Sequence, residues 1–358
     1  MYILTLEINQ KCNLMCKYCY LGEKAGSKMS DEIGYKAINL AFEKGKLHKD
    51  NTLWIDFVGG ETFLDFQMLQ TMVSYVEAKN KDYGYSLLFS TTTNATIFNQ
   101  DILNYLIEKE FTLKISIDGD QETHDMNRVT TSGAGSFDII LKNLKYIKEF
   151  EERTGKVVQV TNVVTENNYK KYYESLVFLT QELGLRYIDT GVDLSIKWTD
   201  EQIAVLEKEI ERSFDYFIDC AKNNQGFRWE FADKVVNLKK QERKKFYSCG
   251  AGIVSSYVRT DGGVYACPGY LDSSVELGNV TKKIEKERIR KLVNFRGIDN
   301  PKCESCDISQ YCVEQSCIMQ NLAGTGDVNK PLKIFCKMRK LMHKIHVDNE
   351  EIISHLVM

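Results

Sequence analysis

The sequence is poor in proline and histidine, with three and five residues respectively among 358, and it lacks a long apolar run. No stretch approaches the run of about 20 apolar residues that a membrane span needs. The start, Met1 to Glu7, alternates like a strand and runs directly into a cysteine motif, which leaves no room for a signal peptide. The 47 basic and 50 acidic residues give a net charge of -3, so no general positive field exists. We therefore expect a cytoplasmic protein without a nucleic-acid or membrane partner.

Cysteine, in contrast, is abundant, with 11 residues in the chain. Disulfides are not expected in the cytoplasm, because that compartment keeps thiols reduced, and clustered cysteines there indicate metal ligation. Ten of the cysteines fall into two groups, and only Cys220 stands apart, in a helical stretch. We interpret Cys220 as a buried structural thiol.

Short β-rich runs alternate with amphipathic helical patterns through the first half of the chain. The expected strands are Ile3–Leu6, Leu53–Phe57, Ser86–Phe89, Leu113–Ile117, Val157–Val164 and Arg186–Ile188. The expected helices between them are Ser30–Glu43, Phe66–Ala78, Gln100–Glu108, Ser136–Phe150 and Tyr169–Leu183, and Ser30 is the expected N-cap of the first by residue type. This alternation predicts an α/β fold with a parallel sheet, in the form of a partial (β/α)6 barrel of the TIM type, and a doubly wound sheet is the alternative.

The composition changes in the last third, where all three prolines lie at or beyond residue 268 and six of the cysteines at or beyond residue 267. Two helical stretches, Thr199–Asn223 and Trp229–Lys245, precede this part. We expect four domains: a barrel over 1–195, a helical bridge over 196–246, a cysteine-rich domain over 247–345 and a tail over 346–358.

The first cysteine group, Cys12, Cys16 and Cys19, follows the first expected strand. Three thiolates on one loop can hold three irons of a four-iron cluster, and the missing fourth leaves one iron open for another ligand. Structural zinc is the alternative, but it needs four closed ligands, and the first histidine of the chain is His48.

This group resembles the radical S-adenosylmethionine (SAM) family, whose signature places an aromatic residue, here Tyr18, before the third cysteine. The family also has a Gly-Gly-Glu after the second strand, which matches Gly59, Gly60 and Glu61. By that resemblance these residues bind the methionine amino group of SAM. Glycines permit a close backbone approach, and a carboxylate pairs with an ammonium group.

Further matches lie at the ends of the third and fourth expected strands. Asn94 stands where the family often has Thr-Asn-Gly, and Ser116 would touch the SAM ribose or carboxylate. Arg128 would pair with the SAM carboxylate, for which a guanidinium fork is well suited. For Asp118 and His124 we favour structural roles, in a turn and as a surface helix cap.

The resemblance implies SAM as a cofactor and reductive cleavage of SAM to a 5'-deoxyadenosyl radical, which takes a hydrogen atom from the substrate. The electron would come from a flavodoxin or ferredoxin. In this reaction the cofactor carries the chemistry, and the barrel orients it and excludes water.

The second cysteine group resembles the SPASM domain, which holds two auxiliary four-iron clusters in relatives. One cluster would be held completely by Cys303, Cys306, Cys312 and Cys336. The other would be held by Cys249, Cys267 and Cys317. The resemblance therefore implies three [4Fe-4S] clusters, one that binds SAM and two that are auxiliary.

Two departures from the SPASM pattern concern the ligand spacing. Four residues, Val313–Ser316, separate Cys312 from Cys317 where the family usually has three. Relatives with full ligation have another cysteine shortly before the one aligned with Cys249, but here that stretch, Arg243–Ser248, contains no thiol. Either another residue such as Cys220 closes that cluster, or one iron is left open.

An open auxiliary iron could bind and deprotonate a substrate cysteine, which favours thioether cross-linking of a ribosomally made peptide. Auxiliary clusters that only conduct electrons or staple the domain are the alternative. Other reactions to weigh are epimerisation, carbon-carbon cross-linking and formylglycine formation by an anaerobic sulfatase maturase. Sulfatase maturases typically have an Asp base directly after the cysteine aligned with Cys267, whereas this chain has Pro268.

A binding or electron-transfer protein that uses the clusters without SAM is the reading from a different class, but it leaves the glycine pair, Glu61 and Arg128 unexplained. Many peptide maturases have a peptide-binding domain ahead of the barrel. The early position of Cys12 leaves no space for one. We therefore expect a separate leader-binding protein, or recognition by the barrel and bridge surface.

Overall fold

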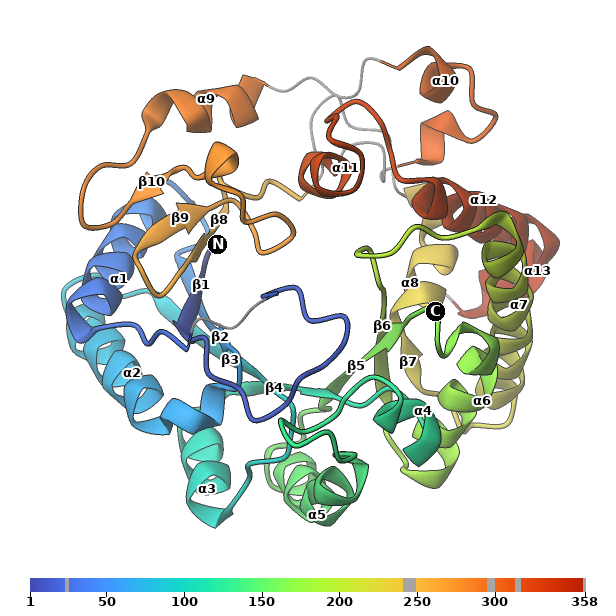
Figure 1. Ribbon diagram of the computed structural model, residues 1–358, viewed down its shortest axis with the longest axis horizontal. Helices are drawn as coiled ribbons and strands as arrows, with labels where there is room; N and C mark the ends of the chain where they lie inside the picture. Colours follow the sequence, from blue (N-terminus) through green and yellow to red (C-terminus); the bar gives the residue numbers. More distant parts are fainter. Residues whose placement is uncertain (23–25, 241–248, 295–299, 313–316, 357–358) are drawn as a thin grey trace. The chain divides into compact units, whose positions relative to one another are not determined.

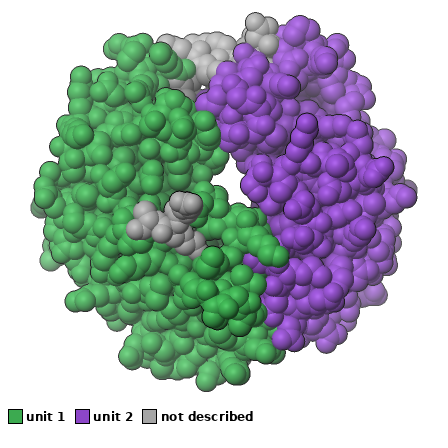
Figure 2. Space-filling model, viewed as in Figure 1, with its two compact units in different colours: residues 1–116, 128–158, 250–293 green, residues 117–127, 159–249, 294–358 purple. Residues whose placement is uncertain are grey.

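The computed structural model describes residues 1–22, 26–240, 249–294, 300–312 and 317–356. The chain forms two compact units, coloured separately in Figure 2. Unit 1 comprises Met1–Ser116, Arg128–Val158 and Gly250–Val293, and unit 2 comprises Ile117–Asn127, Gln159–Cys249 and Asn294–Met358. Neither unit is a continuous stretch of chain, and the four sequential domains expected above stay a prediction.

The sheet of unit 1 is parallel through its centre and antiparallel at one edge (Figure 1). In spatial order its strands are β10 (Gly278–Asn279), β9 (Gly263–Tyr265), β8 (Ser255–Val258), β1 (Tyr2–Asn9), β2 (Thr52–Gly59), β3 (Ser86–Thr93) and β4 (Thr112–Ser116). Strands β8 and β1 to β4 run parallel, and the β8–β9 and β9–β10 pairs are antiparallel. The carboxyl ends of β1 to β4 therefore lie at one edge of this sheet.

Helices pack on the parallel strands because each strand contributes apolar side chains that need cover. The helices of unit 1 are α1 (Asp31–Gly45), α2 (Phe66–Asn80), α3 (Gln100–Glu108), α5 (Phe137–Thr154) and α9 (Lys286–Asn294). Leu4 and Leu6 of β1 and Ile55 and Phe57 of β2 have no exposed surface. The expected N-cap of α1 is confirmed, since the Ser30 hydroxyl accepts the Ile33 backbone N–H at 3.3 Å.

Unit 2 contributes three parallel strands in the order β5 (Gln159–Val164), β6 (Tyr187–Val192) and β7 (Arg228–Trp229). Its helices are α4 (Gln121–Asp125), α6 (Tyr172–Val177), α7 (Asp200–Lys222), α8 (Glu230–Val236), α10 (Pro301–Glu304), α11 (Ile318–Thr325), α12 (Lys333–Asp348) and α13 (Glu350–Leu356). A capping box of Thr199 and Gln202 starts α7 and agrees with the predicted start of that helix.

The predicted α/β class with six strands alternating with helices is confirmed by β1 to β6. The expected helix Tyr169–Leu183 is instead three pieces: a 3-10 turn, α6, and a π-helical turn over Phe178–Glu182. The expected helix Trp229–Lys245 is shorter within the described part, where α8 ends at Val236 and residues 241–248 lie outside the description. Among the described residues, no helix is long and apolar enough to cross a membrane.

Candidate active site

The loop that carries Cys12, Cys16 and Cys19 leaves the carboxyl end of β1, and all three thiols are partly exposed. Leu14 anchors the loop, because its side chain is fully buried and its backbone forms a bridge with Thr130. This anchor leaves the neighbouring cysteines at the surface of unit 1, where their sulfur atoms can bind metal.

Two of the three thiols receive N–H groups from nearby residues. The Leu14 backbone N–H lies 3.4 Å from Cys12 Sγ, and the Asn94 side-chain amide lies 3.7 Å from the same sulfur. Arg128 Nη1 lies 4.0 Å from Cys16 Sγ. Such donors stabilise thiolates and tune the reduction potential of an iron-sulfur cluster, so the surroundings fit the predicted group.

A single metal ion would require its ligand atoms to converge on one point. In the described ranges, no three Cys, His, Asp or Glu side chains converge in this way. Thiolates that each bind a different iron of a cluster need not converge on one point. The arrangement of Cys12, Cys16 and Cys19 is therefore compatible with the predicted cluster.

Gly59 and Gly60 permit a close approach between two parts of the chain. A Cβ atom on Gly60 would lie 2.1 Å from the Lys11 carbonyl oxygen, and one on Gly59 would lie 2.6 Å from that of Asn9. The backbone N–H groups of Gly60 and Glu61 donate to Asn9 O and Lys11 O at 3.0 and 2.8 Å. The glycines thus bring the end of β2 against the start of the cysteine loop, a use that the sequence alone did not predict.

Glu61 is 1% exposed, and its carboxylate accepts three hydrogen bonds. The donors are the Thr93 hydroxyl at 2.7 Å, the Asn94 backbone N–H at 2.7 Å and the Phe63 backbone N–H at 3.1 Å. Burial raises the pKa of the Glu61 carboxyl above its ordinary value. The side chain holds the ends of β2 and β3 together, and its predicted contact with the SAM amino group stays a prediction.

Asn94 follows β3 and is 7% exposed. Its amide donates to Asn13 Oδ1 at 3.0 Å, and its side-chain oxygen accepts the Thr96 backbone N–H at 2.9 Å. Ala95 has a φ of 58°, in the left-handed region that glycine adopts freely. This backbone conformation explains physically why glycine suits the position that Ala95 occupies here.

Arg128 and Tyr18 form a pair beside the cysteine loop. The guanidinium carbon lies 5.1 Å from the centre of the Tyr18 ring, within the range of a cation-π contact. Ser116 ends β4 and is 9% exposed. All the predicted SAM-binding residues belong to unit 1. Gly59 to Glu61, Asn94 and Ser116 lie at the carboxyl ends of β2, β3 and β4. Parallel barrels place their active sites at this edge of the sheet.

The expectation that His124 caps a helix at the surface is wrong. His124 is fully buried, and its Nδ1 accepts the Asp118 backbone N–H at 3.3 Å. Asp118 is 1% exposed and accepts the Val163 backbone N–H at 3.1 Å. The N-cap of α4 is Asp120, whose carboxylate accepts the Thr123 backbone N–H.

Cys303, Cys306, Cys312 and Cys336 all belong to unit 2, and their role as the ligands of one cluster stays a prediction. Burial, and after it the neighbouring Cys312, Cys303 and Cys306, raise the pKa of the Cys336 thiol to about 11. Cys336 lies on α12, and Arg339 of the same helix donates to the Tyr311 carbonyl at 3.1 Å, next to Cys312. This contact ties the helix to the loop that carries the other ligands.

The other predicted auxiliary set is distributed over both units. Cys267 follows β9 in unit 1, and Cys249 and Cys317 belong to unit 2. Both sequence departures, Arg243–Ser248 and Val313–Ser316, lie outside the described residues. This cluster and its ligand number stay a prediction.

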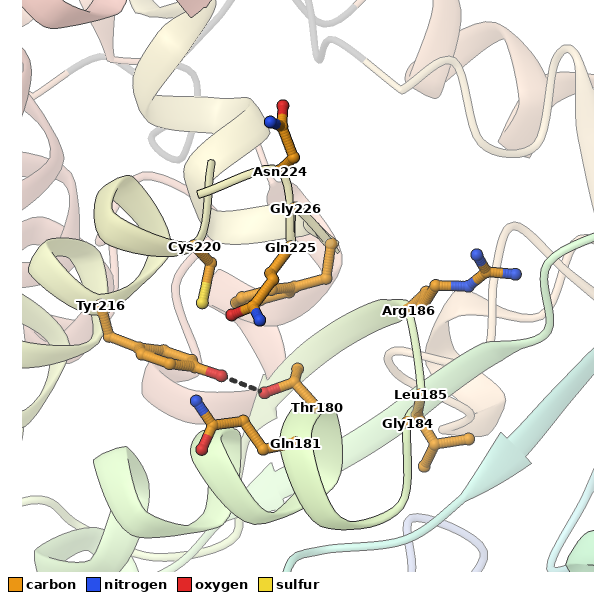
Figure 3. A pocket seen from close by; sticks show the side chains of 11 residues that line it. Thr180, Gln181, Gly184, Leu185, Arg186, Tyr216, Cys220, Asn224, Gln225 and Gly226 are labelled. Carbon is orange, nitrogen blue, oxygen red and sulfur yellow. Dashed lines mark hydrogen bonds between the residues drawn. The ribbon is translucent and has the colours of Figure 1, made fainter. Parts of the chain in front are cut away.

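Cys220 lies in the wall of a pocket of about 600 Å³ in unit 2 (Figure 3). It is 5% exposed, which confirms its predicted burial. Tyr216 and Thr180, whose hydroxyl groups lie 2.7 Å apart, are its neighbours in this pocket. The residues that line the pocket include no other cysteine, so this position gives no support to Cys220 as a fourth cluster ligand.

The sequence was compared with protein families and with curated proteins. Residues 6–179 match the Radical SAM superfamily. An uncharacterized protein of Methanocaldococcus jannaschii is 29% identical over 78% of this chain and 89% of its own. A cysteine-type anaerobic sulfatase-maturating enzyme of Clostridium novyi is 22% identical over 87% of this chain and 86% of its own. A radical SAM cyclopropyl synthase of Paramaledivibacter caminithermalis is 20% identical over 97% of this chain and 74% of its own.

Solved structures agree with this chain along its length. The structure titled native anSMEcpe with bound AdoMet has a TM-score of 0.82 at 17% identity, and the match covers 99% of both chains. The same protein with bound AdoMet and the Cp18Cys peptide gives a TM-score of 0.81 at 17% identity, again over 99% of both chains. This likeness supports the predicted fold class, with a partial barrel in the matched N-terminal part.

Proposed function

This chain is an enzyme of the radical SAM superfamily, and we propose that it forms a thioether cross-link in a ribosomally made peptide. Among its relatives are enzymes that mature sulfatases. A solved structure of similar fold contains a bound peptide beside AdoMet. These similarities support a peptide or protein as the substrate class.

When bound, the first cluster and SAM supply a 5'-deoxyadenosyl radical that can take a hydrogen atom from a substrate carbon. Cys12, Cys16 and Cys19 would hold that cluster. Arg128, held over the Tyr18 ring beside Cys16, supplies a guanidinium group that can pair with the SAM carboxylate. The chain thus provides the ligands and one charged group that orients SAM.

Thioether formation replaces one C–H and one S–H bond of the substrate with a C–S bond. The hydrogen atom of the C–H bond passes to the 5'-deoxyadenosyl carbon, and the thiol releases its hydrogen as a proton. One electron would be left over, and an auxiliary cluster held by Cys249, Cys267 and Cys317 would supply its acceptor, which would balance the electron consumed in cleaving SAM. An iron that binds the substrate sulfur would favour loss of the thiol proton, because a metal deprotonates its thiol ligand.

Pro268 is the observation that carries this choice of reaction. It directly follows Cys267, where the sulfatase maturases resembled here typically have an Asp that acts as base. Proline has no titratable group, so this chain lacks that base at this position. A cluster held only by Cys249, Cys267 and Cys317 would leave one iron open for a substrate thiolate as fourth ligand.

The second candidate function is sulfatase maturation, in which a Cys or Ser side chain becomes formylglycine. The similarity in fold and length to anSMEcpe and the sulfatase-maturating relatives supports it. Carbon-carbon bond formation is a third candidate, supported by the relative that is a cyclopropyl synthase, and epimerisation is a further one.

The proposed partners follow from the chemistry. A flavodoxin or ferredoxin would deliver the electron that cleaves SAM. A separate leader-binding protein would present the peptide.

The test is an anaerobic reaction of the reconstituted enzyme with SAM, a reductant and one of two peptides. One is a cysteine-rich peptide encoded beside the gene, and the other is a sulfatase peptide with its Cys. A thioether keeps sulfur in the product but blocks alkylation of the thiol, whereas formylglycine loses sulfur and reacts with hydrazides.

A Cys16→Ala variant serves as the control, because it should produce neither product and no 5'-deoxyadenosine. Sulfur retained in an unalkylatable product supports thioether formation. A hydrazide-reactive product from the sulfatase peptide would replace the proposal with the second candidate. Enzyme that cleaves SAM but leaves every cysteine alkylatable would refute the thioether proposal.

A further inference from the structure

A buried carboxylate lies in β1 of unit 1, five residues before the first cysteine. Glu7 has no exposed surface, and its two oxygens accept from three donors. The Tyr257 hydroxyl donates to Oε2 at 2.6 Å, the Gln10 side-chain amide to Oε1 at 2.8 Å and the Thr260 backbone N–H to Oε1 at 3.3 Å. Burying a carboxylate is costly unless donors satisfy it, so these bonds hold their partners firmly.

The hydrogen bonds of Gln10 extend this network to both ends of the cysteine loop. Gln10 is the first residue after β1, and its backbone N–H donates to the Ser27 carbonyl at 2.8 Å. The Ser27 hydroxyl in turn donates to Gln10 Oε1 at 2.8 Å and lies 2.8 Å from the Thr260 hydroxyl. Glu7 is therefore connected, through Gln10, to the residues at the beginning and the end of the cysteine loop.

A second connection reaches the loop beside the third cysteine. Tyr20 directly follows Cys19, and its side chain interacts with the Tyr257 hydroxyl. Burial raises the pKa of Tyr257 above its ordinary value, so this hydroxyl stays protonated and remains a donor to Glu7. The series of side-chain contacts from Glu7 through Tyr257 to Tyr20 thus ends next to Cys19, a predicted cluster ligand.

The same carboxylate is bound to the segment that leads to Cys267. Tyr257 lies on β8, and Thr260 lies in the turn between β8 and β9. Strand β9 ends at Tyr265, and Cys267 follows. All these residues belong to unit 1, so Glu7 is a common anchor for the cysteine loop and for the hairpin that precedes Cys267.

We propose that Glu7 is a positioning residue that, through Gln10, Tyr257 and Tyr20, holds the cysteine loop in the conformation in which its thiolates bind the cluster. Glu7 is fully buried, so its influence on the loop passes through these neighbours. Its contribution is to restrict a short loop whose three sulfur atoms must hold fixed relative positions. This role goes beyond the proposed peptide chemistry and does not depend on which bond the enzyme forms.

Hydrogen exchange in the metal-free protein is the primary test, because it reports on the loop itself. Glu7→Gln places an amide N–H against a donor and should raise exchange rates within residues 10–22 by about tenfold, the effect of losing one buried hydrogen bond. Tyr257→Phe removes one donor but keeps the carboxylate, and it should raise the same rates by a smaller factor.

Tyr2→Phe is the matched control. Tyr2 is also buried in β1, and its hydroxyl donates to Ser256 of β8 at 3.0 Å, so it links the same two strands without contacting the loop. This variant should leave exchange within residues 10–22 unchanged. Equal increases in all three variants would reduce Glu7 to an ordinary part of the core and overturn the proposal.

The reconstituted protein supplies a second measurement. The KM of Glu7→Gln for SAM should rise several-fold. The electron paramagnetic resonance spectrum of its reduced cluster with SAM should also differ from that of the wild type. Tyr2→Phe should match the wild type in both measurements. If Glu7→Gln does not fold, Tyr257→Phe decides the outcome by the same two measurements. A wild-type spectrum together with wild-type loop exchange in Tyr257→Phe would refute the positioning role.

Discussion

Replacing Gly60 with alanine tests the inferred packing of the end of β2 against the cysteine loop. The new Cβ would lie 2.1 Å from the oxygen and 2.5 Å from the carbon of the Lys11 carbonyl, well below the 3.0 Å at which such contacts begin. Both are backbone atoms directly before Cys12, so no side-chain rotation relieves the clash. The loop must move away from β2.

The expected cost combines two effects. Forcing a methyl group into a filled site costs about 1–3 kcal/mol. The displacement also weakens the hydrogen bonds from Gly60 N to Asn9 O and from Glu61 N to Lys11 O, each worth about 0.5–1.5 kcal/mol. We therefore expect the free energy of unfolding to fall by about 2–6 kcal/mol, within a total stability of about 5–15 kcal/mol. The variant should fold, but with a displaced loop and a weakened first cluster.

Urea unfolding of the metal-free protein under reducing conditions measures the stability, and iron analysis after reconstitution measures the cluster. Gly191→Ala is the matched control, because its Cβ would meet nothing nearer than Val163 Cγ2 at 3.7 Å. That change should be neutral or stabilising by up to about 1 kcal/mol. Equal stability and equal iron content in the two variants would show that Gly60 does not pack as described.

Three further predictions follow from the site. Burial raises the pKa of the Glu61 carboxyl in the folded state, so the folded protein binds the carboxyl proton more tightly than the unfolded chain does. The contribution of Glu61 to the free energy of unfolding should therefore fall as the pH rises above about 4.3, the pKa of Glu in an unfolded chain. Urea unfolding of the wild type and of Glu61→Gln between pH 4 and 7 measures this, and stabilities that change with pH in the same way in both proteins would contradict it. Arg128→Lys should raise the KM for SAM about tenfold, because an ammonium group cannot reproduce the two hydrogen bonds of the guanidinium fork. Isothermal titration with SAM provides an independent check, and a SAM affinity equal to that of the wild type would contradict the prediction. Iron analysis of the reconstituted wild type should find about twelve irons per chain. Cys336→Ala should lose about four of these irons, and Cys220→Ser should lose none. A wild-type count of about four would refute the auxiliary clusters.

The strands of the parallel sheets could be predicted because apolar residues recur in short β-rich runs with helical patterns between them. The segment Tyr169–Leu183 shows the limit of this method. Its apolar spacing is helical, but the structure inserts a π turn over Phe178–Glu182, after which Leu185 donates to the Leu179 carbonyl. The spacing of apolar residues alone does not indicate the residue that the π turn adds, because this residue depends on how the segment connects to β6.

The burial of His124 contradicts its expected place at the surface, whereas the structural role expected for Asp118 is not contradicted. Both residues are hydrophilic and follow a strand, and composition alone does not indicate that such residues are buried. In the structure each satisfies a backbone N–H that would otherwise be buried without a partner, those of Val163 and Asp118. The need for these acceptors arises from the packing of β5, more than 30 residues later, and no local pattern announces it.

The cysteines could be identified from the sequence, whereas the role of Glu7 could not, because its partners are distant in sequence. Metal ligands crowd into short spacings that a reader of the sequence can recognise, and Cys12, Cys16 and Cys19 span eight residues. Glu7 occupies a strand position whose donors include Tyr257 and Thr260, 250 and 253 residues away. A carboxylate in an apolar strand is costly unless such donors exist, so an acidic residue in a buried strand just before a ligand loop is itself a reason to look for a distant partner. In this chain Tyr257 and Thr260 lie on the segment that leads to Cys267, so the role proposed for Glu7 makes the conformation of the cysteine loop depend on the folding of that segment.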